Sequence, residues 1–168
     1  MTVDGLRIGH GYDVHRFASS FDEKQPLVLA GVRLPEERTL EAHSDGDLVL
    51  HAVCDAILGA VGQGDIGRHF PDDDPQFADV DSRLLLANVL ALVAVQNFRL
   101  VNIDVTVVAQ VPRLSPHRAA MQANLASLLK LAKDRVNLKA TTTEGLGDIG
   151  KELGMACHAV VLLSRISE

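Results

Sequence analysis

The sequence is poor in aromatic residues and in positive charge. Its 168 residues include no Trp, one Tyr and five Phe, so Ala, Val and Leu must fill most of the core. Stacking platforms for nucleic-acid bases are equally scarce. The 16 Lys and Arg against 22 Asp and Glu give a net charge of −6. This balance argues against a general binder of nucleic acids or of anionic membrane surfaces, although a local anion site stays open.

Cysteines and long apolar runs are also few. Cys54 and Cys157 lie far apart and form no C-x-x-C pair, which favours a reducing compartment and two buried apolar side chains. The longest apolar window, Leu84 to Val95, is interrupted by Asn88 and is shorter than the ~18 residues typical of a membrane span. No cationic segment followed by an apolar run opens the chain. We therefore expect a soluble cytoplasmic protein with neither a membrane nor a nucleic-acid partner.

Apolar patterns predict strands interleaved with helices. Strands are expected at 6–15, 27–34, 100–110, 136–140 and 155–165, the first two forming a long-looped hairpin. Helices are expected at 48–60, about 81–97 and about 115–133, begun by Ser44 or Asp45, by Asp81 or Ser82, and by Ser115. This order predicts a single domain over residues 1–168, with one sheet covered by helices on one side. The uncovered face would be buried by assembly with further copies of the chain.

Three residues are candidates for a metal centre. Asp13 and His15 stand two apart in a predicted strand, so their side chains point to one side. His51 lies within a predicted helix, and two imidazoles with one carboxylate leave a fourth position open, as catalytic zinc sites do. Asp47 or Asp55, one helical turn away, could orient His51. The alternative is a half-exposed helix histidine near capping or solvated acids.

Two further segments have both an ordinary and a functional interpretation. Gly62 to Pro75 is dense in Gly, Asp and Pro and is long for an idle connection, so it is either a functional loop or a solvated acidic turn. Thr141 to Thr143 either reflect β-propensity or, beside Glu144, supply hydroxyls and turn N–H groups for a diphosphate and its Mg²⁺.

Five segments resemble, in order, the motifs of the 2-C-methyl-D-erythritol 2,4-cyclodiphosphate synthase family. They read IGHGYDVHRF, LEAHSDGDLVLHA, GDIGRHFPDDDP, NIDVTVVAQVPRLSPH and VNLKATTTEGLG. The resemblance as a whole runs from about Arg7 to Leu163. The resemblance implies a lyase that cyclises 4-diphosphocytidyl-2-C-methyl-D-erythritol 2-phosphate and releases CMP, in non-mevalonate isoprenoid synthesis. It implies a ferredoxin-like α/β (α+β) sheet with helices on one face, assembled as a homotrimer with active sites between subunits.

The resemblance also implies roles for individual residues. Asp13, His15 and His51 would bind Zn²⁺, and Glu144 would hold Mg²⁺ or Mn²⁺ against the substrate diphosphate. The implied transition-state stabilisers are His43 and Thr142. Together with the metal ligands Asp13, His15 and Glu144, these two residues would also touch the substrate.

The remaining implied substrate contacts fall into three groups. The phosphate and methylerythritol side comprises Ser44, Asp65, Ile66 and Gly67, with Phe70, Pro71, Asp72, Asp73 and Asp74 in a mobile loop. The cytosine pocket comprises Ala109, Gln110, Val111, Pro112, Arg113, Leu114 and Ser115, and reads the base largely through backbone groups. The third group comprises Thr141, Thr143, Asp148 and Lys151. One subunit would supply the metal side, and its neighbour would supply the cytosine pocket with Thr142 and Glu144.

Asp148 and Lys151 stand where many relatives carry Phe and Arg. In the family these positions line the substrate site and a central trimer cavity that can bind an isoprenoid diphosphate. Asp148 removes apolar surface and repels phosphate, and Lys151 keeps the charge without the planar fork of arginine. Both departures argue against binding of such a regulator.

Two other functions stay open. A metal-dependent phosphohydrolase could use the same two-His-one-Asp centre to activate water, and a non-catalytic trimeric binding module would make the metal set a coincidence. No Ser or Cys lies in a convincing nucleophile constellation, so a covalent intermediate is not expected.

Overall fold

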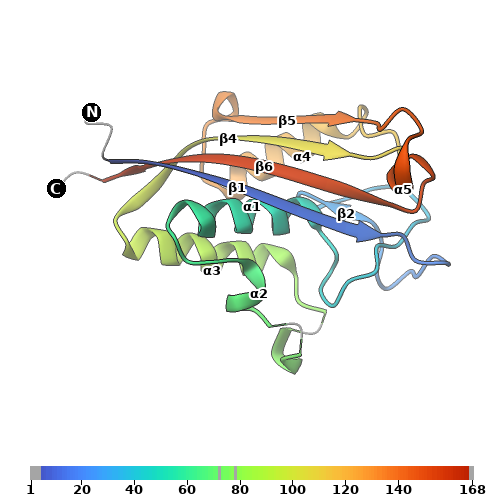
Figure 1. Cartoon of the computed structure of the whole chain (residues 1–168), viewed down its shortest axis with the longest axis horizontal. Helices are drawn as coiled ribbons and strands as arrows, with labels where there is room; N and C mark the ends of the chain where they lie inside the picture. The colour runs from blue at the N-terminus through green and yellow to red at the C-terminus, as the bar shows by residue number, and fades with distance from the viewer. Residues whose placement is uncertain (1–4, 72, 78, 167–168) are drawn as a thin grey trace.

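The computed structural model describes residues 5–71, 73–77 and 79–166 and has a mixed α/β architecture (Figure 1). The strands are β1 (Leu6–Arg16), β2 (Val28–Leu29), β3 (Val32–Arg33), β4 (Phe98–Val108), β5 (Val136–Thr141) and β6 (Gly154–Arg165). The helices are α1 (Leu48–Ala60), α2 (Ile66–His69), α3 (Ser82–Val95), α4 (Arg118–Leu128) and α5 (Gly147–Gly150), with 3₁₀ turns at Pro75–Phe77 and Lys133–Arg135.

The main sheet has four strands in the order β1-β6-β4-β5. The β1–β6 and β6–β4 pairs are antiparallel, whereas β4 and β5 run parallel and are joined through α4. The predicted hairpin between 6–15 and 27–34 is therefore wrong. β1 pairs along its whole length with β6, and 27–34 folds back on itself as β2 and β3 around Ala30 and Gly31, both at positive φ.

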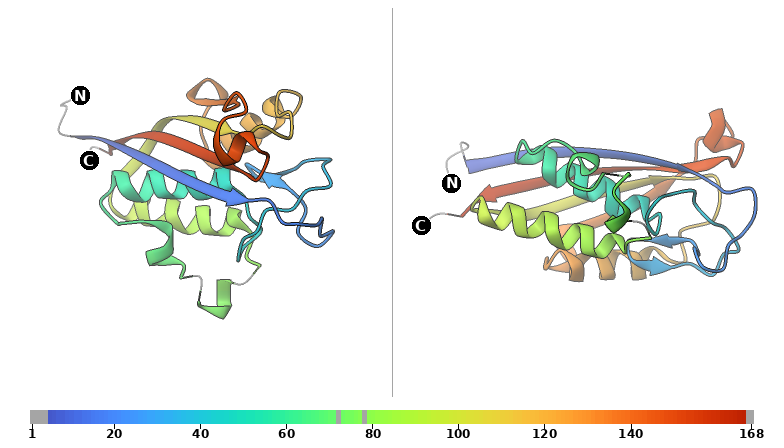
Figure 2. Two further views of the ribbon diagram at one scale, coloured as in Figure 1. Left: turned by 45° about the vertical axis from the view of Figure 1, so that its right-hand side comes forward. Right: turned by 90° about the horizontal axis from the view of Figure 1, so that it is seen from below.

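Helices cover one face of the sheet. Figure 2 shows α1, α3 and α4 on the same side, with α1 across β1 and β6 and α4 against β5. The helix α1 lies so close to β1 that a Cβ at Gly9 would come 1.8 Å from the carbonyl oxygen of Ala56, and one at Gly11 would come 1.9 Å from that of Ala52. These two glycines therefore set how near the helix can approach the strand.

The core between these layers is aliphatic, as the shortage of aromatic residues predicted. Leu, Val, Ala and Ile dominate the buried side chains, and Phe98 is the one buried aromatic in the described chain. Cys54 and Cys157 are buried and unbridged, as expected, and burial raises the pKa of both thiols. None of the helices in the described residues is both long and apolar enough to cross a bilayer.

Helix boundaries differ from expectation where tertiary contacts decide them. α1 is capped by Asp47, not by Ser44 or Asp45. α3 begins at Ser82 with Asp81 as its cap, as one of the two alternatives predicted. Helix α4 begins three residues after the predicted start at Ser115, and no side chain caps its first turn. It ends five residues before the predicted end at 133, because Lys130 adopts a positive φ.

No described part of the chain covers the opposite face of the sheet. Ile8, Tyr12 and Val14 of β1 are 73%, 48% and 54% exposed, and Val160 of β6 is 42% exposed. Apolar side chains thus gather on the β1–β6 half of this open face. The β4–β5 half is polar, with Asp104 contacting Asn137 and Lys139.

Candidate active site

Asp13, His15 and His51 converge at one point, as expected for the candidate metal centre. Strand β1 presents Asp13 and His15 on the same side, and the first turns of α1 present His51. Asp13 Oδ2 lies 2.9 Å from His15 Nε2 and 3.1 Å from His51 Nδ1, and the two ring nitrogens lie 3.3 Å apart. One oxygen and two nitrogen atoms therefore form a compact set that could hold a metal ion.

The charges within this set support one another. Burial by itself would raise the pKa of Asp13, but hydrogen bonds and the charges of His15 and His51 outweigh it and hold the pKa well below its ordinary range. Burial likewise opposes protonation of His15, yet the hydrogen bond and charge of Asp13 raise its pKa above the ordinary value. An ionised carboxylate thus faces two imidazoles, an arrangement that attracts a cation.

Hydrogen bonds on the far side of each ring fix which nitrogen faces inward. His15 Nδ1 lies 2.8 Å from the carbonyl oxygen of Glu41 and must donate to it, so Nε2 is the nitrogen that faces Asp13. In the neutral ring, Nε2 would offer its lone pair to a metal. Ser82 donates its hydroxyl hydrogen to Asp45, so its oxygen accepts from His51 Nε2–H at 2.9 Å. The Nδ1 lone pair of His51 is thereby free for a metal.

The expected partners of His51 were wrong. Asp47 instead accepts from the backbone N–H groups of Ala30, Gly31, Val49 and Leu50. Asp55 accepts from the Ile66 N–H at 2.7 Å. Among the described residues, Asp13 and His15 lie within 3.3 Å of His51 Nδ1, and the hydroxyls of Ser44 and Ser82 lie within 3.1 Å of its Nε2. Sequence spacing offers no signal for Ser82.

These ligands form part of the wall of a cavity of about 310 Å³, which we call the metal cavity. The predicted residues that also line it are His43, Ser44, Ile66, Gly67, Phe70 and Pro71. Phe77, which the sequence did not single out, closes it with its ring edge-to-face on Phe70 at 5.3 Å between centroids.

The rest of the predicted loop lies outside this wall. Asp65 caps α2, a helical turn inside the segment expected to be loop throughout, and accepts from Arg68 N–H at 3.0 Å. Asp74 accepts from Gln76, and Asp73 is exposed. The predicted contact Asp72 lies outside the described residues.

Thr142 and Glu144 lie in a second cavity of about 540 Å³, which we call the threonine cavity. The Thr142 hydroxyl donates to Glu144 Oε1 at 3.1 Å and accepts from the Glu144 N–H at 3.2 Å. The other predicted lining residues are Ala109, Gln110, Pro112, Arg113, Leu114, Ser115 and Thr141. Val111 adjoins them through the cis peptide bond to Pro112, whereas Thr143 turns away and donates to the Leu146 carbonyl at 2.7 Å.

Among the residues that the structure describes, the two cavities share no lining residue. The metal cavity adjoins β1 and the threonine cavity adjoins the ends of β4 and β5, and β1 and β5 are opposite edges of the sheet. With β6 and β4 between them, these edges are about 14 Å apart. Within one chain, the residues predicted to form a single site therefore lie in two separate cavities.

A family model, the YgbB family, matches residues 6–164. The chain belongs to the YgbB family. Over 158 residues it is 56% identical to the 2-C-methyl-D-erythritol 2,4-cyclodiphosphate synthase of Azotobacter vinelandii, covering 94% of this chain and 98% of that protein.

Solved structures of the family agree in fold. The bifunctional IspDF of Campylobacter jejuni is similar with a TM-score of 0.89 and 45% identity, covering 96% of this chain and 43% of that one. A CDP complex of IspF from Plasmodium falciparum is similar with a TM-score of 0.84 and 34% identity, covering 99% and 100%.

Two predicted contacts of this YgbB-family chain lie apart from both cavities. Asp148 in α5 and Lys151 just after it are exposed, and they pair with each other at 3.8 Å.

A further hollow of about 660 Å³ between α3, β4 and the end of α4 has mainly apolar walls, and it holds none of the predicted site residues.

Proposed function

We propose that this chain converts 4-diphosphocytidyl-2-C-methyl-D-erythritol 2-phosphate to 2-C-methyl-D-erythritol 2,4-cyclodiphosphate at the metal cavity, with release of CMP. The chain is a 2-C-methyl-D-erythritol 2,4-cyclodiphosphate synthase of isoprenoid synthesis, since near-full-length relatives at 53–56% identity carry that name. The observation that carries the local assignment is the convergence of Asp13, His15 and His51 on one point of a cavity wall.

Asp13, His15 and His51 would hold Zn²⁺. Two imidazole nitrogens with preset tautomers and one ionised carboxylate fit that ion and leave a ligand position open. When bound, the metal supplies positive charge that offsets repulsion between the two phosphate groups. The threonine cavity contributes Glu144, whose carboxylate would hold Mg²⁺ or Mn²⁺ against the diphosphate.

The protein's own groups align the reaction. The 2-phosphate attacks the β-phosphorus of the diphosphate and CMP leaves, so the main requirements are orientation and charge compensation. His43 and Ser44 line the metal cavity, where they would bind the phosphate side. The Thr142 hydroxyl would donate to the transition state, and backbone groups from Ala109 to Ser115 would read the cytosine.

The complete site would form between subunits of a homotrimer. We propose this because the metal cavity and the threonine cavity lie on opposite edges of one sheet, too far apart to act on one diphosphate. The exposed apolar face of β1 and β6 supports assembly with further copies. The ferredoxin-like assignment, the single domain over residues 1–168 and a cytoplasmic location belong to the same proposal, the last supported by two unbridged buried cysteines.

The test of the reaction is product analysis. Purified protein incubated with the substrate, Zn²⁺ and Mg²⁺ is expected to release CMP and the cyclic diphosphate in equal amounts, measured by phosphorus NMR. A linear phosphate product would instead indicate the phosphohydrolase. Failure to release CMP while the substrate still binds would indicate a binding module.

A further inference from the structure

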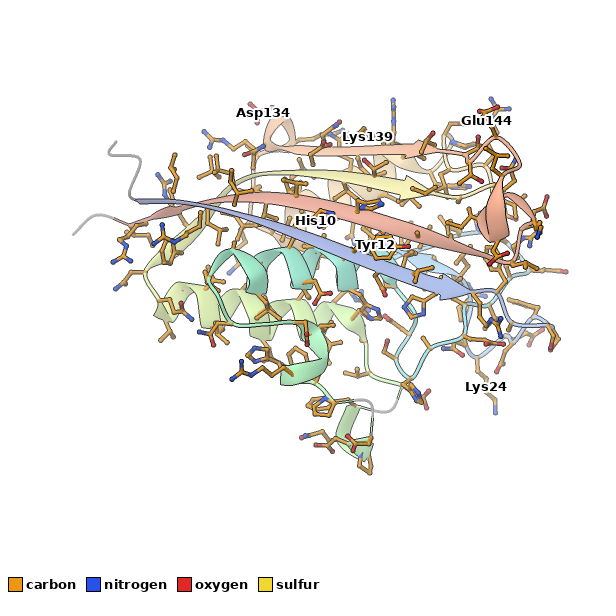
Figure 3. All side chains as sticks on the ribbon, viewed as in Figure 1. His10, Tyr12, Lys24, Asp134, Lys139 and Glu144 are labelled. Carbon is orange, nitrogen blue, oxygen red and sulfur yellow. The ribbon has the colours of Figure 1, made fainter. Side chains whose placement is uncertain are left out.

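A second pair of histidines lies on the open face of the sheet, away from the metal cavity. His10 of β1 and His158 of β6 are diagonal neighbours, because His158 pairs directly with Tyr12 in the antiparallel register. His10 Nε2 and His158 Nδ1 lie 3.2 Å apart, and the ring centroids are 5.4 Å apart. Figure 3 shows His10 and Tyr12 on this uncovered side of the ribbon.

The separation of these two nitrogens suits a shared metal ion. Two nitrogens each about 2.1 Å from a tetrahedral metal lie about 3.4 Å apart. The ring nitrogens of His15 and His51 in the metal cavity are 3.3 Å apart, almost the same as the 3.2 Å between His10 and His158. The open face therefore repeats the two-imidazole part of the metal cavity on the other side of β1.

The surroundings hold this pair in place. Both histidines lie on paired strands, and the Tyr12 ring packs on His158 at 4.8 Å between centroids, which limits how far that imidazole can turn. Asp104, an acid on the same face, is paired with Lys139 and lies opposite Val160 in the register of the sheet. His10 is exposed and His158 half-buried, which leaves room for water or another copy's side chains to complete the coordination.

We propose that His10 and His158 form a second site for a divalent transition-metal ion that prefers imidazole ligands, such as Zn²⁺ or Co²⁺. This site is separate from catalysis. In the homotrimer proposed above, the same face would meet other copies, whose histidine pairs would supply further ligands. The pair itself lies within one chain, so the inference does not depend on the cyclisation activity.

The test is a count of bound metal. Metal-free protein is dialysed against Zn²⁺, and the zinc retained per chain is measured by elemental mass spectrometry. We expect wild type to retain more than one equivalent per chain, and His158→Gln or His10→Gln to lose the excess over one. Either variant should keep its cyclisation rate within about twofold, because neither side chain lines a reaction cavity.

Controls separate this site from the catalytic metal. His51→Gln should lose the other zinc and keep the excess, whereas His117→Gln, which lies outside both sets, should change neither. Circular dichroism verifies that each variant is folded. The proposal is overturned if wild type retains no more than one equivalent, or if the excess survives in both His158→Gln and His10→Gln, which would leave the pair as a hydrogen bond.

Discussion

The metal cavity and the threonine cavity differ in how completely one chain builds them. In the metal cavity, the side chains of Asp13, His15 and His51 are only 24%, 15% and 12% exposed, and hydrogen bonds from behind fix both rings. In the threonine cavity, Thr142 and Glu144 are exposed and hydrogen-bond to each other. The side chains of the metal cavity are thus held in place before any ligand binds, whereas those of the threonine cavity are exposed.

The two cavities therefore contribute to the site in different ways. A buried ionised set must be rigid, because low dielectric makes a misplaced charge costly. An exposed turn can meet a partner's cavity and close over a substrate that neither chain holds alone. Substitutions in the two cavities should therefore change the cyclisation rate and zinc binding differently.

The largest effect is expected from the metal ligands. His51→Gln or Asp13→Asn should lower the cyclisation rate by a factor on the order of 10³ or more, since charge compensation at the phosphates is lost. Either variant should also lose one zinc per chain in elemental analysis. Retention of both zinc and full activity would contradict the assignment of this cavity.

Substitutions in the threonine cavity should separate activity from zinc binding. Thr142→Val or Glu144→Gln should lower the rate by about 10²–10³-fold while zinc at Asp13, His15 and His51 is retained. Glu152→Gln, an exposed acid outside both cavities, serves as the matched control. Loss of zinc in the Glu144 variant would show that the two cavities are not independent.

Ser82 tests whether the hydrogen bonds behind the metal cavity matter. Ser82→Ala removes the nearer of the two hydroxyls at His51 Nε2, leaving Ser44 at 3.1 Å, and should weaken zinc binding by about 10–100-fold. Excess zinc should restore its rate, as expected for a positioning residue. An unchanged zinc affinity, measured by competition with a chelator, would argue against this role.

Asp47 tests the frame beneath the metal cavity. Its buried carboxylate accepts four backbone N–H groups, so Asp47→Asn should lower the free energy of unfolding by about 1–3 kcal/mol. Burial raises the pKa of Asp47 to about 6, above its ordinary value of 3.8. The folded state then binds more protons between these values, so wild-type stability from this group falls as pH rises through that window.

The Asn variant lacks this titration, so its deficit should be larger near pH 4 than near pH 7. Urea unfolding of both metal-free proteins at several pH values measures the difference, in which all other titrations cancel. A deficit independent of pH would contradict the raised pKa.

Sequence reasoning succeeded where a local pattern decides the outcome. Alternation in β1 places Asp13 and His15 on one side, and helical periodicity places His51 in α1. Their ligand types and the family resemblance, not a local pattern, joined His51 to this pair. Partners chosen by tertiary packing were not predictable. The β1–β6 pairing joins the two ends of the chain, and Ser82 reaches His51 from a helix 31 positions away.

Other errors have equally specific causes. The end of α4 depends on the left-handed conformation of Lys130. The usual sequence signals for a helix end, glycine and proline, do not mark this position. Asp47 takes the cap that Ser44 or Asp45 was expected to form, because its side chain also binds the turn at Ala30 and Gly31. Separation of the predicted site into two cavities is a property of the sheet order, which one sequence does not reveal.

The central claim is that the metal cavity of one chain works with the threonine cavity of another. The direct measurement mixes two inactive variants, His51→Gln and Glu144→Gln, unfolds and refolds them together, and follows CMP release. With random assembly at equal amounts, about a quarter of the intersubunit sites combine two intact cavities, so we predict recovery of about a quarter of wild-type activity. If the mixture stays as inactive as each variant alone, the site does not form between subunits and the account is wrong.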